Sequence, residues 1–445
     1  MSNTSISFKR IQQLALPAMV AGVAEPLLSL TDAAVVGNIP ITGTEALAAV
    51  GIVGSFLSML IWVLGQTRAA IATIIAQNLG AGKIDELGAF PAQAIYINVV
   101  MSLLVLVSTY FFAEQIFTFL NAENQVLQMS LDYYSIRVWG FPLTLLVFGI
   151  FGVFRGLQNT FWPMIIAILG AGVNIGLDFL LVYGWEGWVT AQGLTGAAWA
   201  SLCAQLFMAV LSLILLLKKT KVSLRLYFPL HHEIRRLVPM SLNLFVRAIA
   251  LNAALLIAVR EATALGKEQI AAHAIAINIW LFSAFFIDGY GAAGNLLSGK
   301  LLGGKEYNRL LLLAKRVNLY NVVICVLLML GGFLCYEPLG RLFNKDPLVL
   351  EVFYSMFYLV LLCQPLNAVA FTFDAIFKGL GEMRYLRDVL LGATLLAFLP
   401  VLYLCRYLEM GLTGIWIALL AWVFYRGAAL VIKFMRKFYP LAQNQ

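Results

Sequence analysis

Two aspartates and an asparagine, set in two apolar stretches far apart in the chain, are the side chains best suited to chemistry. Asp32 lies near the end of the stretch 11–36 and Asp178 near the end of 160–183, with Asn174 four residues before Asp178. If both stretches are helices running in the same direction, the two carboxylates lie at similar depth and Asn174 shares the face of Asp178. Such a cluster can hold a desolvated cation, Na⁺ included, through oxygen ligands. It can also share one proton, because neighbouring carboxylates disfavour double ionisation.

A candidate hinge precedes Asp32 in the same stretch. Pro26 has no backbone N–H, so the carbonyl of Gly22 loses its partner four residues on and a helix can kink there. Because Asp32 follows within two turns, protonation or cation binding at Asp32 could be coupled to bending at Pro26. The alternative is a static kink beside a structural hydrogen-bond acceptor.

Other ionisable residues also lie within apolar stretches, where each is costly unless it is paired or wetted. Asp288 in "FFIDGYG" and Asp374 in "FTFDAIF" are candidates for a substrate site or a second coupling site, or for pairing with Arg or Lys. Glu25 is either cavity-facing or paired. We interpret the three arginines of these stretches as partners within the same half of the chain or as snorkelling groups: Arg137, Arg247 and Arg426.

The elements that must position these residues are membrane-spanning helices. The 445-residue chain is 62% hydrophobic and 12% charged, against about 45–50% and about 25% in soluble domains. Crossing a bilayer takes roughly 20 apolar residues. Continuous rather than alternating apolar runs indicate helices, not barrel strands. The predicted spans are 11–36, 46–76, 88–112, 130–154, 160–183, 194–217, 234–260, 268–298, 308–336, 348–377, 386–405 and 412–435.

Basic residues orient these spans. Lys and Arg gather in the loops on the side of both termini, above all in the connector "KKTKVSLRLYFPLHHEIRR" at 218–236. The positive-inside rule therefore places both termini in the cytoplasm. The net charge of +8 is explained by basic loops facing anionic lipid, not by binding to nucleic acid.

The chain repeats itself after about 220 residues, which predicts two homologous lobes. For example, "GLTGAAWA" at 193–200 matches "GLTGIWIA" at 411–418. Six spans per repeat make the repeats parallel, related by a pseudo-two-fold axis along the membrane normal. The predicted domains are 1–220, a connector at 221–236, and 237–445. Asp32 aligns with Ala254 and Asp178 with the region of Pro400, so the acidic pair breaks the internal symmetry.

These features resemble the multidrug and toxic compound extrusion (MATE) transporters, and among them the bacterial branch named for DNA-damage-inducible protein F (DinF). The resemblance covers essentially the whole chain. It rests on four motifs: "LALPAMVAGVAEPLLSLTDAAVVGNI" at 14–39, "NIGLDFLLVYG" at 174–184, "GAAWAS" at 196–201 and "IDGYG" at 287–291.

The resemblance implies an all-α fold of twelve transmembrane helices in two six-helix bundles, in the inner (plasma) membrane of a bacterium. It also implies export of lipophilic, often cationic compounds by antiport against H⁺ or Na⁺. In this branch the coupling network matches Asp32, Asn174, Asp178 and the hydroxyl of Ser201. The Ala197 carbonyl would be the neighbouring ligand of a bound cation. A tyrosine of the fourth helix often joins, and Tyr133 and Tyr134 are both candidates.

Two rival classes were weighed against an exporter. A lipid-linked precursor flippase of related fold would need several basic residues for a phosphate group, and in the first half only Arg137 lies well inside a span. An integral membrane enzyme is disfavoured because the sequence has three histidines, no metal-type cluster and no Ser/His/Asp arrangement. We therefore expect no cofactor beyond the coupling ion, and a monomer whose partners are small amphipathic or cationic molecules and the lipid bilayer.

Overall fold

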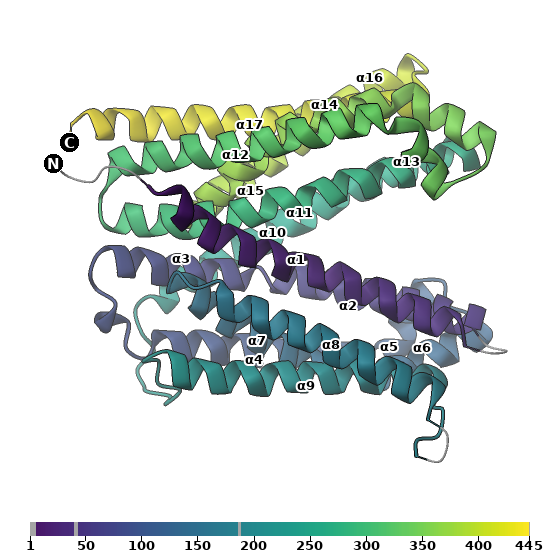
Figure 1. Ribbon diagram of the computed structural model, residues 1–445, viewed down its shortest axis with the longest axis horizontal. Helices are drawn as coiled ribbons and strands as arrows, with labels where there is room; N and C mark the ends of the chain where they lie inside the picture. Colours follow the sequence, from purple (N-terminus) through teal and green to yellow (C-terminus); the bar gives the residue numbers. More distant parts are fainter. Residues whose placement is uncertain (1–5, 40–42, 186–187, 445) are drawn as a thin grey trace. The chain divides into compact units, whose positions relative to one another are not determined.

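The computed structural model describes residues 6–39, 43–185 and 188–444, and of residues 24–30 it describes the backbone alone. These residues form two compact units. The N-terminal unit comprises 20–75 and 83–241, and the C-terminal unit comprises 242–445 together with 1–19 and 76–82. The regular secondary structure of the described residues is helical, apart from one isolated β-bridge between Trp185 and Val189. The all-α architecture expected from the sequence is confirmed (Figure 1).

The first nine α-helices supply most of the N-terminal unit. Their bounds are α1 Phe8–Gly37, α2 Gly43–Leu64, α3 Thr67–Gly80, α4 Phe90–Phe111, α5 Ala113–Phe119, α6 Asn124–Arg137, α7 Gly140–Gly156, α8 Phe161–Tyr183 and α9 Gly193–Lys219, with a 3₁₀ turn η1 at Asp85–Leu87. α9 packs against α6, α7 and α8, and α4 packs against α7. α8 and α9 therefore bring the predicted coupling residues of both helices into one bundle (Figure 1).

The remaining helices build most of the C-terminal unit. Their bounds are α10 Ile234–Ala264, α11 Lys267–Gly303, α12 Tyr307–Leu334, α13 Tyr336–Phe343, α14 Pro347–Gly379, α15 Met383–Gly392, a π-helical segment η2 Ala393–Phe398, α16 Leu399–Tyr407 and α17 Gly411–Gln443. α14 packs against α11, α12 and α17, so it lies at the centre of this unit. Its residue Asp374 is buried as a result.

Membrane-spanning helices occur where hydropathy predicts them. Among the described residues, ten helices are long and apolar enough to cross a membrane, and α6 with α7 forms an eleventh span bent by 46°. The twelfth predicted span corresponds to α1, part of whose side chains lies outside the described residues. Large apolar side chains such as Leu104, Phe111 and Leu327 are exposed on these helices, as a lipid-facing surface requires.

Three predicted spans are not single regular helices. The span 46–76 is interrupted at Gly65 and Gln66, between α2 and α3. The span 130–154 is interrupted at Val138 and Trp139, between α6 and α7. Pro142 explains the break, because its ring displaces the carbonyl of Val138 and it offers no N–H to that carbonyl. The span 386–405 contains the π-helical segment Ala393–Phe398, and Pro400 has the same relation to the Leu396 carbonyl within it.

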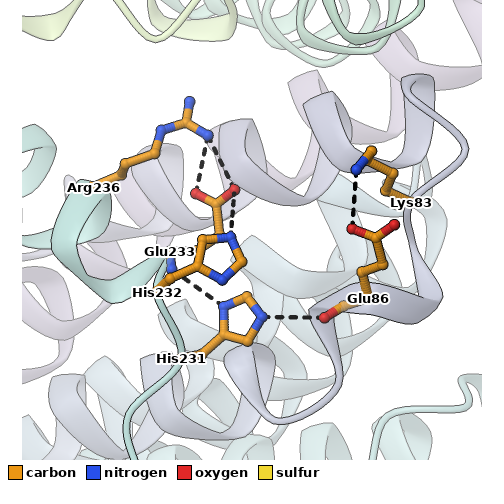
Figure 2. Close-up of polar contacts among 6 residues, drawn as sticks. All are labelled: Lys83, Glu86, His231, His232, Glu233 and Arg236. Atoms are coloured by element: carbon orange, nitrogen blue, oxygen red, sulfur yellow. Dashed lines mark hydrogen bonds and ion pairs between the residues drawn. The ribbon is translucent and has the colours of Figure 1, made fainter.

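The polar connector is docked on the N-terminal unit. The Gln93 side chain of α4 donates to the Tyr227 carbonyl at 2.7 Å and accepts from the His231 N–H at 2.8 Å. The His231 ring lies 3.1 Å from the Glu86 carbonyl oxygen, and Arg236 donates to both carboxylate oxygens of Glu233 (Figure 2). These contacts fix the chain where it enters α10.

Candidate functional site

The N-terminal unit brings Asp32, Asn174 and Asp178 together. The Asn174 side-chain nitrogen donates to Asp178 Oδ2 at 2.6 Å and to Asp32 Oδ1 at 3.3 Å. Because one amide group bridges both carboxyl groups, the two acids from α1 and α8 converge on one point. Asp178 is fully buried, Asn174 is 6% exposed, and Asp32 is half-buried. The cluster therefore has one fully buried carboxyl group and one half-buried carboxyl group.

Two residues of α6 lie beside this cluster. Tyr133 is buried and lies within electrostatic range of Asp32, Asp178 and Arg137. Arg137 in turn lies within electrostatic range of Asp178. Arg137 is thus placed as a partner within its own half of the chain, as we interpreted it from the sequence. Among the described side chains, one cation thus faces two acids, which favours binding of a proton or a metal cation.

Tyr134, the alternative tyrosine, is engaged elsewhere. Its hydroxyl lies 2.6 Å from the Thr109 hydroxyl of α4, and its ring packs edge-on against Phe117 with centroids 5.1 Å apart. The structure therefore separates two neighbours that the sequence left equivalent. It places Tyr133, and not Tyr134, beside the aspartates.

The α9 residues of the expected network lie alongside α8 without hydrogen bonding to the aspartates in the described structure. Gly196 permits the close approach, since a Cβ there would lie 2.5 Å from the Leu181 carbonyl oxygen of α8. Ala197 is buried in the same apolar cluster as Val182. Ser201 is 1% exposed, and its hydroxyl has no hydrogen-bond partner among the described residues.

The hinge residues lie within α1, which is continuous from Phe8 to Gly37. The side chains of Glu25 and Pro26 fall outside the described residues, so the kink and the placement of Glu25 stay predictions. A Cβ added at Gly22 would meet no atom within 4 Å. The backbone at Gly22 is therefore not held by close packing.

The buried Asp178 carboxylate keeps one oxygen available. Its Oδ2 accepts from Asn174, while its Oδ1 has no hydrogen-bond partner among the described residues. A buried carboxylate oxygen without a donor is costly, and a proton or a metal cation removes that cost. Chemically, the cluster offers two carboxylates and an amide oxygen, which are ligands that suit either ion.

The C-terminal unit holds a second buried ionic cluster, centred on Asp374 of α14. Asp374 Oδ1 accepts from Arg247 Nε at 3.1 Å and from Arg247 Nη2 at 2.5 Å. Asp374 Oδ2 lies 3.1 Å from Lys378 Nζ, and Arg426 Nη2 lies 3.9 Å from Oδ1. Asp288 is within electrostatic range of Lys378. Arg247 and Arg426 are thus partners within their own half of the chain, as predicted.

Lys378 is the member of this cluster that sequence reasoning missed. The predicted span 348–377 stops one residue before Lys378, which lies in the last turn of α14 with its side chain 20% exposed. The signal was present in the sequence, because Asp374 and Lys378 are four residues apart and face each other on a helix.

Comparison with known proteins identifies the class to which this fold belongs. The family model MatE matches residues 17–180 and 244–404, one match in each half of the chain. The chain therefore belongs to the MatE family.

Individual relatives are distant. Protein DETOXIFICATION 43 of Arabidopsis thaliana is 28% identical over 297 residues, covering 67% of this chain and 55% of the plant protein. The chain thus spans little more than half of that relative. The probable multidrug resistance protein NorM of Thermotoga maritima is 24% identical over 434 residues, covering 96% of this chain and 92% of NorM. A crystal structure of MATE in the bent conformation matches with a TM-score of 0.90 at 19% identity, covering 98% of this chain and 96% of that one.

Proposed function

We propose that the protein is a secondary active multidrug exporter that moves lipophilic or cationic compounds out of the cell by antiport against H⁺ or Na⁺. Family membership supports a transporter, and relatives such as NorM carry multidrug resistance in their names. The observation that carries the coupling proposal is the bridge that Asn174 makes between Asp32 and Asp178.

The Asn174 bridge supports coupling because the net charge of the Asp32–Asp178 pair changes when an ion binds. With no ion bound, two carboxylates share one amide donor group and repel each other. A bound proton or cation relieves the repulsion and draws Asp32 of α1 toward Asp178 of α8. In the proposed mechanism this shift bends α1 at Pro26, next to the Gly22 carbonyl, and changes access to the cargo by alternating access.

The internal repeat supports the same assignment. Asp32 aligns with Ala254, which is fully buried in the apolar core of the C-terminal unit. The acid pair is thus restricted to one unit of a duplicated scaffold. We further propose that both termini face the cytoplasm in a bacterial plasma membrane, since the Lys and Arg residues gather on that side.

An export assay in cells tests the function. Cells that express the wild type should accumulate less of a fluorescent cationic dye than cells with an empty vector. Asp32→Asn should raise accumulation to the empty-vector level, because an amide can neither release a proton nor neutralise a cation. Asp132→Asn is the matched control, since Asp132 is an exposed acid of α6 in the same unit and should export normally. Normal efflux by Asp32→Asn, at wild-type abundance in the membrane, would remove Asp32 from the coupling mechanism.

A further inference from the structure

Arg426 of α17 has unused hydrogen-bonding capacity in a dry environment. Its side chain is 1% exposed, yet Nη1 and Nη2 have no hydrogen-bond partner among the described residues. Buried polar groups nearly always have partners, and a buried guanidinium without them is especially costly. A guanidinium in this arrangement is suited to bind an anionic ligand.

The charges around Arg426 point the same way. Asp374 is engaged by Arg247 and Lys378, and Arg426 lies at 3.9 Å from it, beyond hydrogen-bonding distance. With Asp288 included, the cluster holds three cationic and two acidic side chains. Among the side chains named here, cationic groups outnumber acidic ones. A ligand that carries a negative charge would balance the cluster.

Aromatic rings hold the guanidinium in place. Arg426 Cζ lies 4.7 Å from the centroid of the Trp422 ring and 5.2 Å from that of Phe371. Beside these rings, the two terminal nitrogens are the guanidinium groups without a hydrogen-bond partner among the described residues. A planar fork of this kind suits the two oxygens of a carboxylate or phosphate.

Trp422, whose ring lies against Arg426, is hydrogen-bonded to an irregular helical segment. Trp422 Nε1 donates to Thr394 Oγ1 at 3.1 Å, and Thr394 lies in the π-helical segment Ala393–Phe398. Short π-helical segments inside α-helices occur frequently at functional sites. Arg426 of α17 is thus linked, through Trp422 and Thr394, to the π-helical segment of the preceding span 386–405.

We propose that Arg426 is the centre of an oxyanion-binding site in the C-terminal unit, with Arg247 and Lys378 contributing positive charge. The ligand class is a small molecule or lipid headgroup that carries a carboxylate or a phosphate. The site is distinct from the acidic site of the N-terminal unit. If the bound oxyanion is also a transported molecule, the proposal rests on the proposed export function. Oxyanion binding itself requires no transport.

Equilibrium binding to the purified full-length protein in detergent tests the proposal. The probes are succinate, inorganic phosphate and dihexanoyl phosphatidic acid, each titrated against sodium chloride of equal ionic strength. The readouts are the melting temperature and the change in tryptophan fluorescence, which Trp422 should report. Wild type should respond saturably to at least one probe. A response to succinate or phosphate identifies a soluble ligand class, and a response to phosphatidic acid alone identifies a lipid source.

Substitutions assign the response to Arg426. Arg426→Gln should weaken the apparent affinity by about tenfold or more, because a bidentate charge-assisted pair is lost. Arg426→Lys keeps the charge without the fork and should give an intermediate loss. Arg436→Gln removes an exposed arginine of the same helix and should bind as wild type does.

Two results would overturn the proposal: a wild type that responds to none of the three probes, or equal affinities for wild type and Arg426→Lys. Both comparisons stand even if Arg426→Gln does not fold. Since no gradient is applied, failure here leaves the Asp32 export test intact, and failure of that test leaves oxyanion binding intact.

Discussion

The two units surround their buried acidic side chains with different partners. In the N-terminal unit, Asp178 has one carboxylate oxygen without a described partner and shares its amide donor with Asp32. In the C-terminal unit, Asp374 has partners on both oxygens. An acid without a direct ion pair among the described residues can exchange a proton or a cation, whereas an acid held directly by two cations is locked. On this basis we propose that ion exchange takes place in the first unit and that Asp374 is part of a fixed framework in the second.

The largest effect should follow from changing the unsatisfied acid. Asp178→Asn should reduce dye export to background, because the amide cannot exchange a proton or bind a cation in place of the carboxylate. The melting temperature of this variant should not fall, since the new amide oxygen at position 178 can still accept the hydrogen bond from Asn174. Export assays and thermal denaturation of the same preparation check both parts. Loss of stability together with export would mean that Asp178 is structural, and the contrast between the units would break.

The mirror substitution in the C-terminal unit should act on stability first. Asp374→Asn leaves Arg247, Lys378 and Arg426 without their central anion, and breaking a buried ion pair from one side costs about 3–5 kcal/mol. Thermal denaturation in detergent should show a large fall in melting temperature. Asp388→Asn, at an exposed pair with Arg387, should cost at most about 1 kcal/mol. Equal melting temperatures for both variants would show that Asp374 is not the locked acid described above.

The smallest effect should separate two adjacent tyrosines. Tyr134→Phe removes the hydrogen bond with Thr109 and should cost about 0.5–1.5 kcal/mol with export intact. Tyr133→Phe removes a hydroxyl beside Asp32 and Asp178 and should shift the pH dependence of export, with little change in stability. Export measured across a pH series, with melting temperatures alongside, distinguishes the two. The reverse pattern would place Tyr134 in the coupling network instead.

Much of this arrangement could be predicted because membrane depth is readable from a sequence. Counting residues from the ends of two apolar stretches placed Asp32 and Asp178 at one level, and helical spacing placed Asn174 with Asp178. The same reasoning could not separate Tyr133 from Tyr134, since successive residues point to different faces and the register of α6 depends on its packing. Nor did it place the Ser201 hydroxyl, which has no described hydrogen-bond partner.

Irregular backbone was harder to anticipate than span positions. Hydropathy reports how long and how apolar a stretch is. It therefore cannot predict the break before α7 or the π-helical segment before α16. Pro142 and Pro400 carried the information, each four residues after a carbonyl it displaces. The ion pair of Lys378 with Asp374 was missed for a related reason, because a span boundary drawn from apolar content excludes a lysine that turns inward.

Transport in proteoliposomes under imposed gradients tests most directly whether the acidic site of the N-terminal unit couples ion flow to export. Purified wild type and Asp32→Asn would be compared for cationic dye movement driven by a pH gradient, with and without Na⁺. We expect one of the two gradients to drive transport by wild type and neither to drive transport by Asp32→Asn. Wild-type transport that responds to neither gradient, or equal transport by Asp32→Asn, would contradict coupling at this site.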